Sequence, residues 1–265
     1  MPVKVEVGES PLRLRLLSAL GFAERREARV PDGVRVYAVG DIHGCSMQLD
    51  RLHQQIAADA ASSRGDKSIV YLGDYIDRGP DSRGVIERLL HGVPQGFDVT
   101  FIKGNHEAAI LSFLEDAGYY RAWRAYGAPE TLISYGVHPP LYDAPGKFEE
   151  ARRALVAAIP GEHLKFLRSL ELTSIVGDYA FVHAGIRPGL RIEEQSEQDL
   201  LWIREDFLDC TALYDKVVVH GHTPVPAPVR LRNRIAVDTG VYVSGVLTCA
   251  VLEGDSCRFI QAGNG

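Results

Sequence analysis

Three short apolar runs, each followed by a polar loop and a helical pattern, organise the first half of the chain. The runs are rich in β-branched and aromatic residues, as buried strands are, and they cover residues 34–39, 68–72 and 98–103. After the loop that follows each run, apolar residues recur at spacings of three and four, which predicts a helix. This alternation predicts an α/β fold in which the three strands share one parallel sheet.

The loops behind the three runs carry side chains that bind metals. They read Gly40-Asp41-Ile42-His43-Gly44, Gly73-Asp74-Tyr75-Ile76-Asp77-Arg78-Gly79 and Gly104-Asn105-His106-Glu107. Parallel strands place such loops at one edge of a sheet, where open α/β sheets bind ligands. Asp and Gly also serve turn geometry alone, but three loops with metal-competent side chains favour a site. Asp74 leaves its strand first, and its two carboxylate oxygens can bridge two cations.

The second half of the chain returns to strand patterns. A hairpin over residues 174–182 ends in His183-Ala184-Gly185, and the run 216–219 leads into His220-Gly221-His222-Thr223. Histidines at strand ends supply the nitrogen ligands of a mixed site. Alternation along the strand places His220 inside the fold and favours His222 as the ligand. Three further short strands are predicted for a second sheet, at 235–238, 246–251 and 258–260.

Two segments lie outside the strand pattern. Residues 1–32 mix charges, prolines and leucines, and we predict a peripheral N-terminal arm before a single domain over residues 33–265. Residues from about 112 to 165 show helical patterns, and we expect them to form a helical insert beside the active face.

Arg204 follows an aromatic residue, so its guanidinium can either grip a phosphate or pair with Glu205 or Asp206.

Composition and charge narrow the class of protein. The chain has 265 residues, of which 46% are hydrophobic and 24% charged, as in an ordinary globular domain. A net charge of −6 gives no general attraction to nucleic acid or to anionic membranes. The four cysteines form no Cys-x-x-Cys pair, and no segment resembles a signal peptide or a membrane span. We therefore expect a cytoplasmic protein without nucleic-acid or membrane partners.

The five motifs at 40–44, 73–79, 104–107, 183–185 and 221–223 resemble the motif series of the calcineurin-like metallophosphoesterases. Among these, the chain looks most similar to the bacterial forms of the phosphoprotein phosphatase branch. The resemblance covers about residues 34 to 240, with the motifs in the family order. It implies a four-layer αββα sandwich, in which two mixed β-sheets are flanked by helices.

The resemblance also implies a centre with two divalent metal ions. It assigns Asp41, His43 and Asp74 to the first ion, and Asp74, Asn105, His183 and His222 to the second. This mixture of oxygen and imidazole ligands favours Mn²⁺, with Fe, Zn²⁺ or Mg²⁺ as alternatives. In the same family pattern, Asp77 orients His106, which protonates the leaving group. Arg78 matches the phosphate-gripping arginine, and Arg204 matches a second one.

The resemblance leaves two substrate classes open. The first hypothesis is a serine/threonine protein phosphatase acting on a phosphorylated protein or peptide, and the alternative is a symmetrical dinucleoside tetraphosphate hydrolase. The insert carries seven acids against six bases and no arginine cluster, which favours a peptide lying on a surface that contains Trp123 or Tyr126. Eukaryotic members carry an arginine or similar residue where this chain has His220-Gly221, and partner-binding signatures are missing. No regulatory subunit is therefore inferred. A catalytically silent binding module is disfavoured, because every proposed ligand is present.

Overall fold

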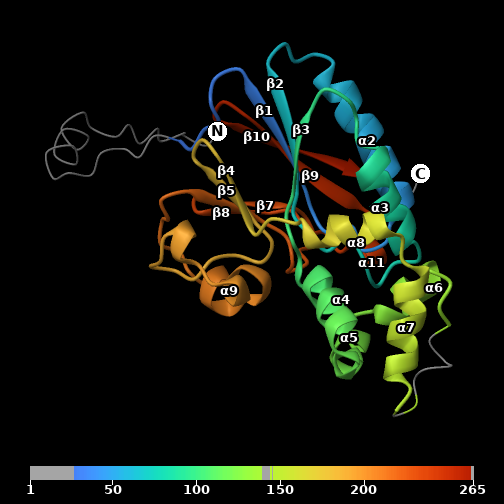
Figure 1. Cartoon of the computed structure of the whole chain (residues 1–265). Coiled ribbons are helices and arrows are strands. Elements are labelled where there is room, and N and C mark those ends of the chain that lie inside the picture. The colour runs from blue at the N-terminus through green and yellow to red at the C-terminus, as the bar shows by residue number, and fades with distance from the viewer. Residues whose placement is uncertain (1–26, 139–143, 145, 264–265) are drawn as a thin grey trace, which may run out of the picture.

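In the computed structural model, which describes residues 27–138, 144 and 146–263, two five-stranded sheets pack face to face with helices outside them (Figure 1). The helices α2 (Ser46–Ala60) and α3 (Ser82–His91) lie outside the first sheet. The helices α9 (Glu197–Trp202) and α10 (Glu205–Leu208) cover the second. The predicted four-layer αββα sandwich is confirmed.

The first sheet has the strand order β10-β9-β1-β2-β3. Its strands are β1 (Val34–Val39), β2 (Asp66–Tyr71), β3 (Asp98–Phe101), β9 (Leu247–Glu253) and β10 (Ser256–Ala262). The three predicted strands β1, β2 and β3 are parallel, whereas β9 runs antiparallel to β1 and to β10. The assignment of 246–251 and 258–260 to a second sheet was therefore wrong. Those runs form β9 and β10, and they complete the first sheet because β9 pairs with the open edge of β1 and β10 pairs with β9.

The second sheet has the order β4-β5-β6-β8-β7. Its strands are β4 (Thr173–Val176), β5 (Tyr179–Val182), β6 (Val217–His220), β7 (Val229–Arg230) and β8 (Arg234–Ala236). The β4–β5 hairpin agrees with the prediction, and β5, β6 and β8 are parallel to one another. The carboxyl ends of β5 and β6 therefore deliver His183 and His222 to the same edge.

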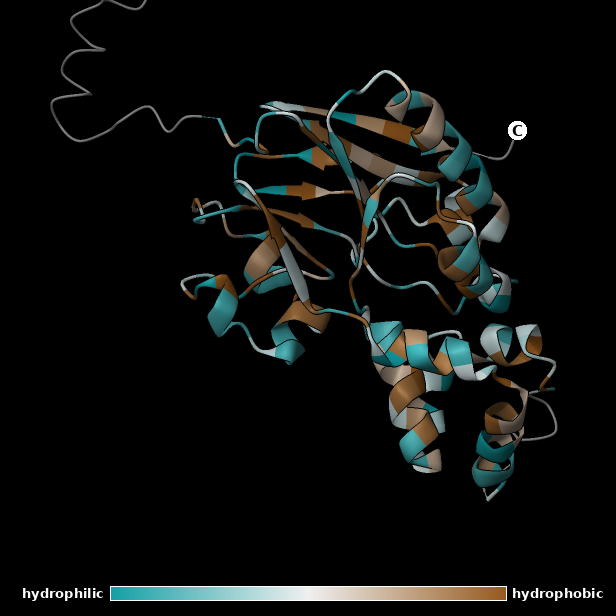
Figure 2. Ribbon diagram, turned by 45° about the horizontal axis from the view of Figure 1, so that its top comes forward, coloured by the Kyte–Doolittle hydropathy of each residue, from teal (hydrophilic) through white to brown (hydrophobic). Residues whose placement is uncertain are grey.

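Strand alternation separates the layers of the core. Val36 and Ala38 of β1 face the space between the two sheets, while Tyr37 and Val39 face α2 and α3. Successive side chains of a strand point to opposite faces, so one buried strand serves both layers. Figure 2 shows hydrophobic and hydrophilic colours side by side along the helices, as expected for helices with one buried face.

A group of helices follows β3, where the insert was predicted. It consists of α4 (Asn105–Glu115), the short 3₁₀ turn η1 (Ala117–Tyr119), α5 (Tyr120–Arg124), α6 (Ala128–Ser134), α7 (Phe148–Ala158) and α8 (Gly161–Arg168). Two more short elements, η3 (Ile192–Glu194) and α11 (Val241–Ser244), lie in later loops. In the described part of the chain, no helix has the length and apolar composition needed to cross a bilayer.

The predicted N-terminal arm lies largely outside the described residues. Its described end joins the two sheets, because the Val30 N–H donates to the Gly254 carbonyl and the Arg29 N–H donates to Asp178. Gly254 lies between β9 and β10, and Asp178 between β4 and β5. Val30 is fully buried between the sheets. The boundary between arm and domain remains a prediction.

Candidate active site

Two groups of buried ligand atoms meet at Asp74. In one group the ligand atoms of His43, Asp74 and His106 lie within 4.8 Å of one another, and in the other those of Asp74, His183 and His222 do. The loops that carry them follow β1, β2, β3, β5 and β6, so both sheets contribute. Asp74 is the residue that the two groups share, which is the geometry required of a bridging carboxylate.

The two oxygens of Asp74 face different neighbours. Oδ2 lies 3.6 Å from Nε2 of His43 and 3.7 Å from Nε2 of His106. Oδ1 lies 3.4 Å from Nε2 of His183. The Asn105 side-chain oxygen lies 2.9 Å from both His183 Nε2 and His222 Nδ1. Asp74 thus lies between His43 on one side and a group of three residues, Asn105, His183 and His222, on the other.

Backbone carbonyls fix the orientation of two of these imidazoles. His43 Nδ1 donates to the Ile76 carbonyl at 2.9 Å, and His183 Nδ1 donates to the Leu72 carbonyl at 2.8 Å. Each bond places the ring proton on Nδ1, so Nε2 carries a lone pair and lies on the side of Asp74. Histidines that ligate metals are held in this way by their second nitrogen.

Asp41 lies beside the second group, and its carboxylate accepts the His222 backbone N–H at 3.0 Å. The structure thus brings Asp41 to the centre without making it a member of either three-residue group. A Cβ on Gly221 would stand 1.9 Å from Asp41 Oδ1, so this close approach requires glycine. His220 packs edge-on against Phe207 and belongs to neither group of ligand atoms around Asp74.

A buried carboxylate pairs with the proposed proton donor. His106 Nδ1 donates to Asp77 Oδ2 at 2.7 Å, and both side chains are almost fully buried. Burial lowers the pKa of His106, but Asp74 and Asp77 outweigh it and raise the pKa above its usual value. His106 is therefore oriented by Asp77, with its Nε2 3.7 Å from Asp74 Oδ2.

Two residues that the sequence interpretation did not assign to the site, Trp123 and Thr131, donate hydrogen bonds to Asp77. Trp123 Nε1 donates to Asp77 Oδ2 at 2.8 Å, and the Thr131 hydroxyl donates to Asp77 Oδ1 at 2.6 Å. Trp123 is fully buried and cannot lie on a peptide-binding surface, whereas Tyr126, the other residue considered for that surface, is half-buried. The indole N–H gives it a hydrogen-bonding role that no local pattern around residue 123 indicates.

Glu107 holds two of the loops together. Its carboxylate accepts the backbone N–H groups of Asp74, Tyr75 and Gly104 at 2.8–2.9 Å. The residue is fully buried. It belongs to the Gly-Asn-His-Glu motif, but the sequence gives no indication that its side chain reaches the loop after β2. Glu107 therefore fixes Asp74 relative to Asn105 and His106.

Backbone strain concentrates in the same loops. Within the described residues, positive φ values outside glycine occur at His43, Asp74, Asp77, Arg78 and His222. This left-handed conformation costs about 1–2 kcal/mol per residue for side chains other than glycine. All five positions were predicted as site residues, so the surrounding hydrogen bonds maintain a conformation that aims these side chains inward.

The two predicted arginines approach from different sides. Arg78 is half-buried, and it donates to the Tyr242 hydroxyl while its guanidinium lies 4.8 Å from the centre of the Tyr242 ring. Arg204 is exposed, and its Nη1 lies 3.4 Å from the Thr223 hydroxyl. Burial is the main cause of the lowered pKa of His183 and His222, and the charge of Arg204 contributes to it. The charge of Arg78 likewise acts on His43, so both arginines lie within electrostatic reach of the two groups around Asp74.

The expected alternative for Arg204, an ion pair with Glu205 or Asp206, does not form within the described residues. Asp206 pairs instead with Arg187, whose Nη1 lies 3.2 Å from it, and Arg187 also binds Asp199. Arg204 is therefore left to face the loop that carries His222.

A sequence profile of the calcineurin-like phosphoesterases matches residues 34–248, which span all five motifs. The chain belongs to this family. It is therefore a phosphoesterase, a hydrolase of phosphate esters, and the predicted superfamily is confirmed.

Curated relatives of this phosphoesterase carry dinucleotide-hydrolase names. The chain is 25% identical over 231 residues to the asymmetrical bis(5'-nucleosyl)-tetraphosphatase PrpE of Anoxybacillus flavithermus, covering 79% of this chain and 87% of the relative. It is 30% identical over 152 residues to a symmetrical bis(5'-nucleosyl)-tetraphosphatase of Dechloromonas aromatica, covering 57% and 44%. A crystal structure named as a candidate diadenosine tetraphosphatase aligns with a TM-score of 0.61 at 21% identity, covering 91% of this chain and all of that one.

Calcineurin-like phosphoesterases use divalent metal ions, and the residues of this chain fit two of them. Carboxylate, amide and imidazole donors converge from both sides of Asp74. Nε2 of His183, whose proton lies on Nδ1, is 2.9 Å from the Asn105 side-chain oxygen and 3.2 Å from His222 Nδ1, so lone pairs face one another where a cation would sit. Burial lowers the pKa of His43 to about 3, so its ring is neutral at physiological pH, as a metal ligand must be.

One further acidic residue belongs to this region. Asp238 is buried, and burial with the nearby Asp74 raises its pKa to about 6. Burial and the charges of Asp238 and Asp74 in turn raise the pKa of Asp41. Such crowding of buried acids is unfavourable unless cations compensate it. The sequence interpretation placed Asp238 at a strand end and assigned it no role.

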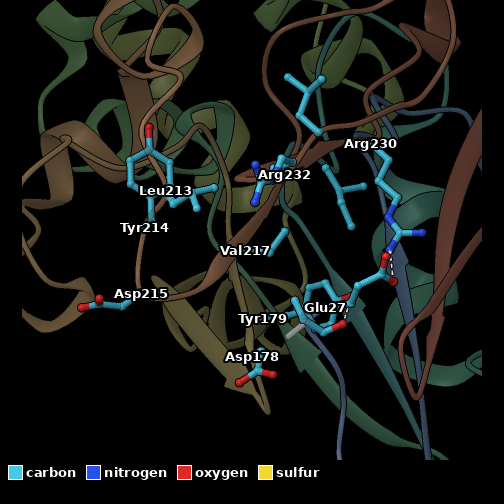
Figure 3. A pocket seen from close by; sticks show the side chains of 12 residues that line it. Glu27, Asp178, Tyr179, Leu213, Tyr214, Asp215, Val217, Arg230 and Arg232 are labelled. Carbon is cyan, nitrogen blue, oxygen red and sulfur yellow. Dashed lines mark hydrogen bonds and ion pairs between the residues drawn. The ribbon is translucent and has the colours of Figure 1, made fainter. Parts of the chain in front are cut away.

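A separate pocket of about 940 Å³ opens at the other end of the second sheet (Figure 3). Its lining includes Glu27, Tyr179, Arg230 and Arg232, and Glu27 pairs with Arg230 at 3.9 Å. Asp178 and Val217 place it at the amino ends of β5 and β6. No member of the two groups around Asp74 lines this pocket, so it is separate from the candidate site at the carboxyl ends of the strands.

Proposed function

We propose that the protein is a metal-dependent hydrolase of dinucleoside tetraphosphates, which cleaves a P–O–P linkage with water. The observation that carries the reaction type is the pair of buried ligand groups sharing Asp74, with His106 directed at the same carboxylate. The names of relatives that span four-fifths of the chain support the substrate class. We therefore prefer dinucleotide hydrolysis to the protein phosphatase, although the sequence hypothesis named the symmetrical form and the relatives that span most of the chain bear the asymmetrical name.

The residues that would hold two divalent ions are Asp41, His43, Asp74, Asn105, His183 and His222. When bound, such ions activate a water molecule and neutralise the charge on the phosphate oxygens. The chain itself supplies the rest of the reaction. His106, held through Nδ1 by Asp77, has its Nε2 directed into the site and can donate a proton to the departing phosphate oxygen.

Arg78 and Arg204 supply positive charge on two sides of the ligand groups. A tetraphosphate presents several phosphates, and guanidinium groups bind phosphate oxygens in a bidentate manner. The exposed position of Arg204 suits a phosphate beyond the one being attacked, whereas the half-buried Arg78 suits the reacting phosphate.

The earlier preference for a phosphopeptide rested on two arguments that the structure weakens. Trp123 is buried against Asp77 and cannot line a surface for a peptide. The charge count of the insert includes Glu149, which lies within 2.8–2.9 Å of Arg152 and Arg153 on α7. Charges that pair with each other on one helix enter the charge count of the insert, but they do not show which charges face the substrate.

The decisive measurement is kcat/KM for diadenosine tetraphosphate and for a phosphothreonine peptide, compared under Mn²⁺ in one buffer. We expect the dinucleotide to be favoured by about tenfold or more, which corresponds to about 1.4 kcal/mol of transition-state binding. We expect ATP and AMP as products, because the relatives that span most of the chain bear the asymmetrical name. A tenfold preference for the peptide would restore the protein-phosphatase hypothesis, and two ADP would indicate symmetrical cleavage.

A further inference from the structure

A second cluster of metal-binding side chains lies where α3 packs against α8. Glu87 and His91 stand one turn apart at the end of α3, and Glu162 and His163 begin α8. These four residues share no member with the groups around Asp74. The cluster also lies at the opposite end of α3 from Ser82, which borders the active-site loop. It is therefore a distinct place in the fold.

The spacing of the donor atoms in this cluster suits a small cation. The ligand atoms of Glu87, Glu162 and His163 lie within 4.8 Å of one another. His163 Nε2 is 3.2 Å from Glu87 Oε1, and His91 Nε2 is 3.5 Å from Glu162 Oε2 and 3.9 Å from Glu87 Oε2. Ligand atoms of a tetrahedral zinc ion, about 2.0–2.2 Å from the metal, lie about 3.3–3.6 Å apart.

His163 is the residue that points to a ligand. Its side chain is fully buried, and its Nε2 faces Glu87 Oε1 at 3.2 Å in a geometry that is poor for a hydrogen bond. Its Nδ1 lies 2.9 Å from the Tyr135 hydroxyl. If Nδ1–H donates to that hydroxyl, Nε2 presents a lone pair to the cluster. A second-nitrogen bond of this kind is typical of histidines that ligate metals.

The competing cation near the cluster is Arg83. Its Nε lies 3.9 Å from Glu87 Oε1, and both side chains are well exposed, so this ion pair holds Glu87 weakly. His91 and Glu162 have fewer restraints, since both side chains are more than half exposed and can adjust their rotamers. A metal can therefore draw four ligands together around the buried nitrogen.

We propose that Glu87, His91, Glu162 and His163 form a binding site for a divalent transition-metal ion, with Zn²⁺ as the best fit. Two imidazoles and two carboxylates match the nitrogen and oxygen ligands of zinc, and Mg²⁺ disfavours imidazole. The ion joins α8 to α3, and through α3 it ties the helical insert to the first sheet. Its role is to stabilise the insert rather than to take part in hydrolysis.

The test compares zinc content after dialysis of the full chain against buffered micromolar Zn²⁺. The variant combines His91→Ala with Glu162→Gln, two exposed positions whose change leaves the core intact. The matched control combines His138→Ala with Glu150→Gln, which are exposed and lie outside the cluster. We expect the variant to bind one zinc ion per chain fewer than wild type, and the control to bind as many as wild type. Equal zinc content in variant and wild type would overturn the proposal.

Two further measurements use the same proteins. Zn²⁺ should raise the Tm of wild type and control by several degrees more than that of the variant, because binding to the folded state stabilises it, and Mg²⁺ should not. Tyr135→Phe keeps the packing but removes the acceptor for Nδ1, and should weaken zinc binding at this site by about tenfold or more. A Zn²⁺-induced rise in Tm that is the same in the variant would also contradict the site.

Discussion

The two walls of the active site are built in different ways. On the first sheet, the loops after β2 and β3 are cross-linked by buried carboxylates, since Glu107 accepts backbone N–H groups from both and Asp77 accepts from His106. On the second sheet, Arg204 is exposed and makes one long contact with Thr223. The first wall is therefore fixed before any substrate arrives, and the outer part of the second wall can adapt.

This difference separates chemistry from substrate choice. Metal ligands and a proton donor must hold their positions closely, which buried and fully hydrogen-bonded carboxylates achieve. A guanidinium at the rim acts through charge over several ångströms and tolerates movement. Changes on the first wall should therefore abolish or redirect the reaction, whereas changes at the rim should alter binding by modest factors.

The largest effect is expected from Asp74→Asn, which removes the negative charge shared by the two ligand groups. We expect turnover to fall below detection and the bound metal per chain to drop, measured by elemental analysis of the purified protein. Asp98→Asn, an exposed carboxylate at the start of β3, is the control and should keep both. A variant at position 74 with full activity and full metal content would exclude the bridging role.

The next effect depends on the leaving group. His106→Asn should lower kcat by roughly 10²–10⁴ on alkyl phosphates such as a phosphothreonine peptide, which need a proton on the departing oxygen. The loss should be much smaller on diadenosine tetraphosphate and p-nitrophenyl phosphate, whose leaving groups are weaker bases. Equal losses on all three substrates would assign His106 to positioning instead of proton transfer.

A smaller effect is expected behind His106. Trp123→Phe keeps a ring in the core but removes the N–H that binds Asp77. A hydrogen bond to a charged group contributes about 1.5–3 kcal/mol. We expect kcat on the phosphothreonine peptide to fall by about tenfold, with a smaller change on p-nitrophenyl phosphate. If the Tm falls and both substrates lose activity equally, Trp123 serves packing alone.

The smallest effect is expected at the rim. Arg204→Ala should raise KM for diadenosine tetraphosphate by a few-fold, leave kcat and metal content unchanged, and matter less at high salt because exposed charges are screened. Arg64→Ala, an exposed arginine in the loop between α2 and β2, provides the control for net charge. A loss in kcat comparable with that of His106→Asn would place Arg204 on the fixed wall.

The parts of the site that follow from local sequence were predictable. Each loop of the first wall comes directly after an apolar run, so strand, loop and helix could be read together, and β1 has the predicted bounds Val34–Val39. The start of α3 is also set locally, because the side chain of its N-cap residue Asp81 accepts the Gly84 N–H. At these positions the structure is determined by residues that are close in sequence, so the sequence was enough to predict it.

The parts that depend on distant contacts were not predictable. Trp123 and Thr131 reach Asp77 from 46 and 54 residues away, and nothing in their neighbourhood marks them. β9 belongs to the first sheet because it pairs with β1. The apolar residues of a strand do not indicate which other strand it pairs with. The argument for a peptide substrate was weak for a related reason, because a charge count ignores which side chains face the groove.

The position of β1 has a consequence for how the chain is made. β1 lies between β2 and β9, and the Arg35 side chain bonds to Glu253 across 218 residues. During synthesis, one edge of this apolar strand stays open until residues 247–253 leave the ribosome. Unpaired strand edges invite association with other chains. The β9–β10 hairpin therefore acts as the last closing piece of the first sheet, and nascent chains lacking it are the species that a chaperone would need to shield.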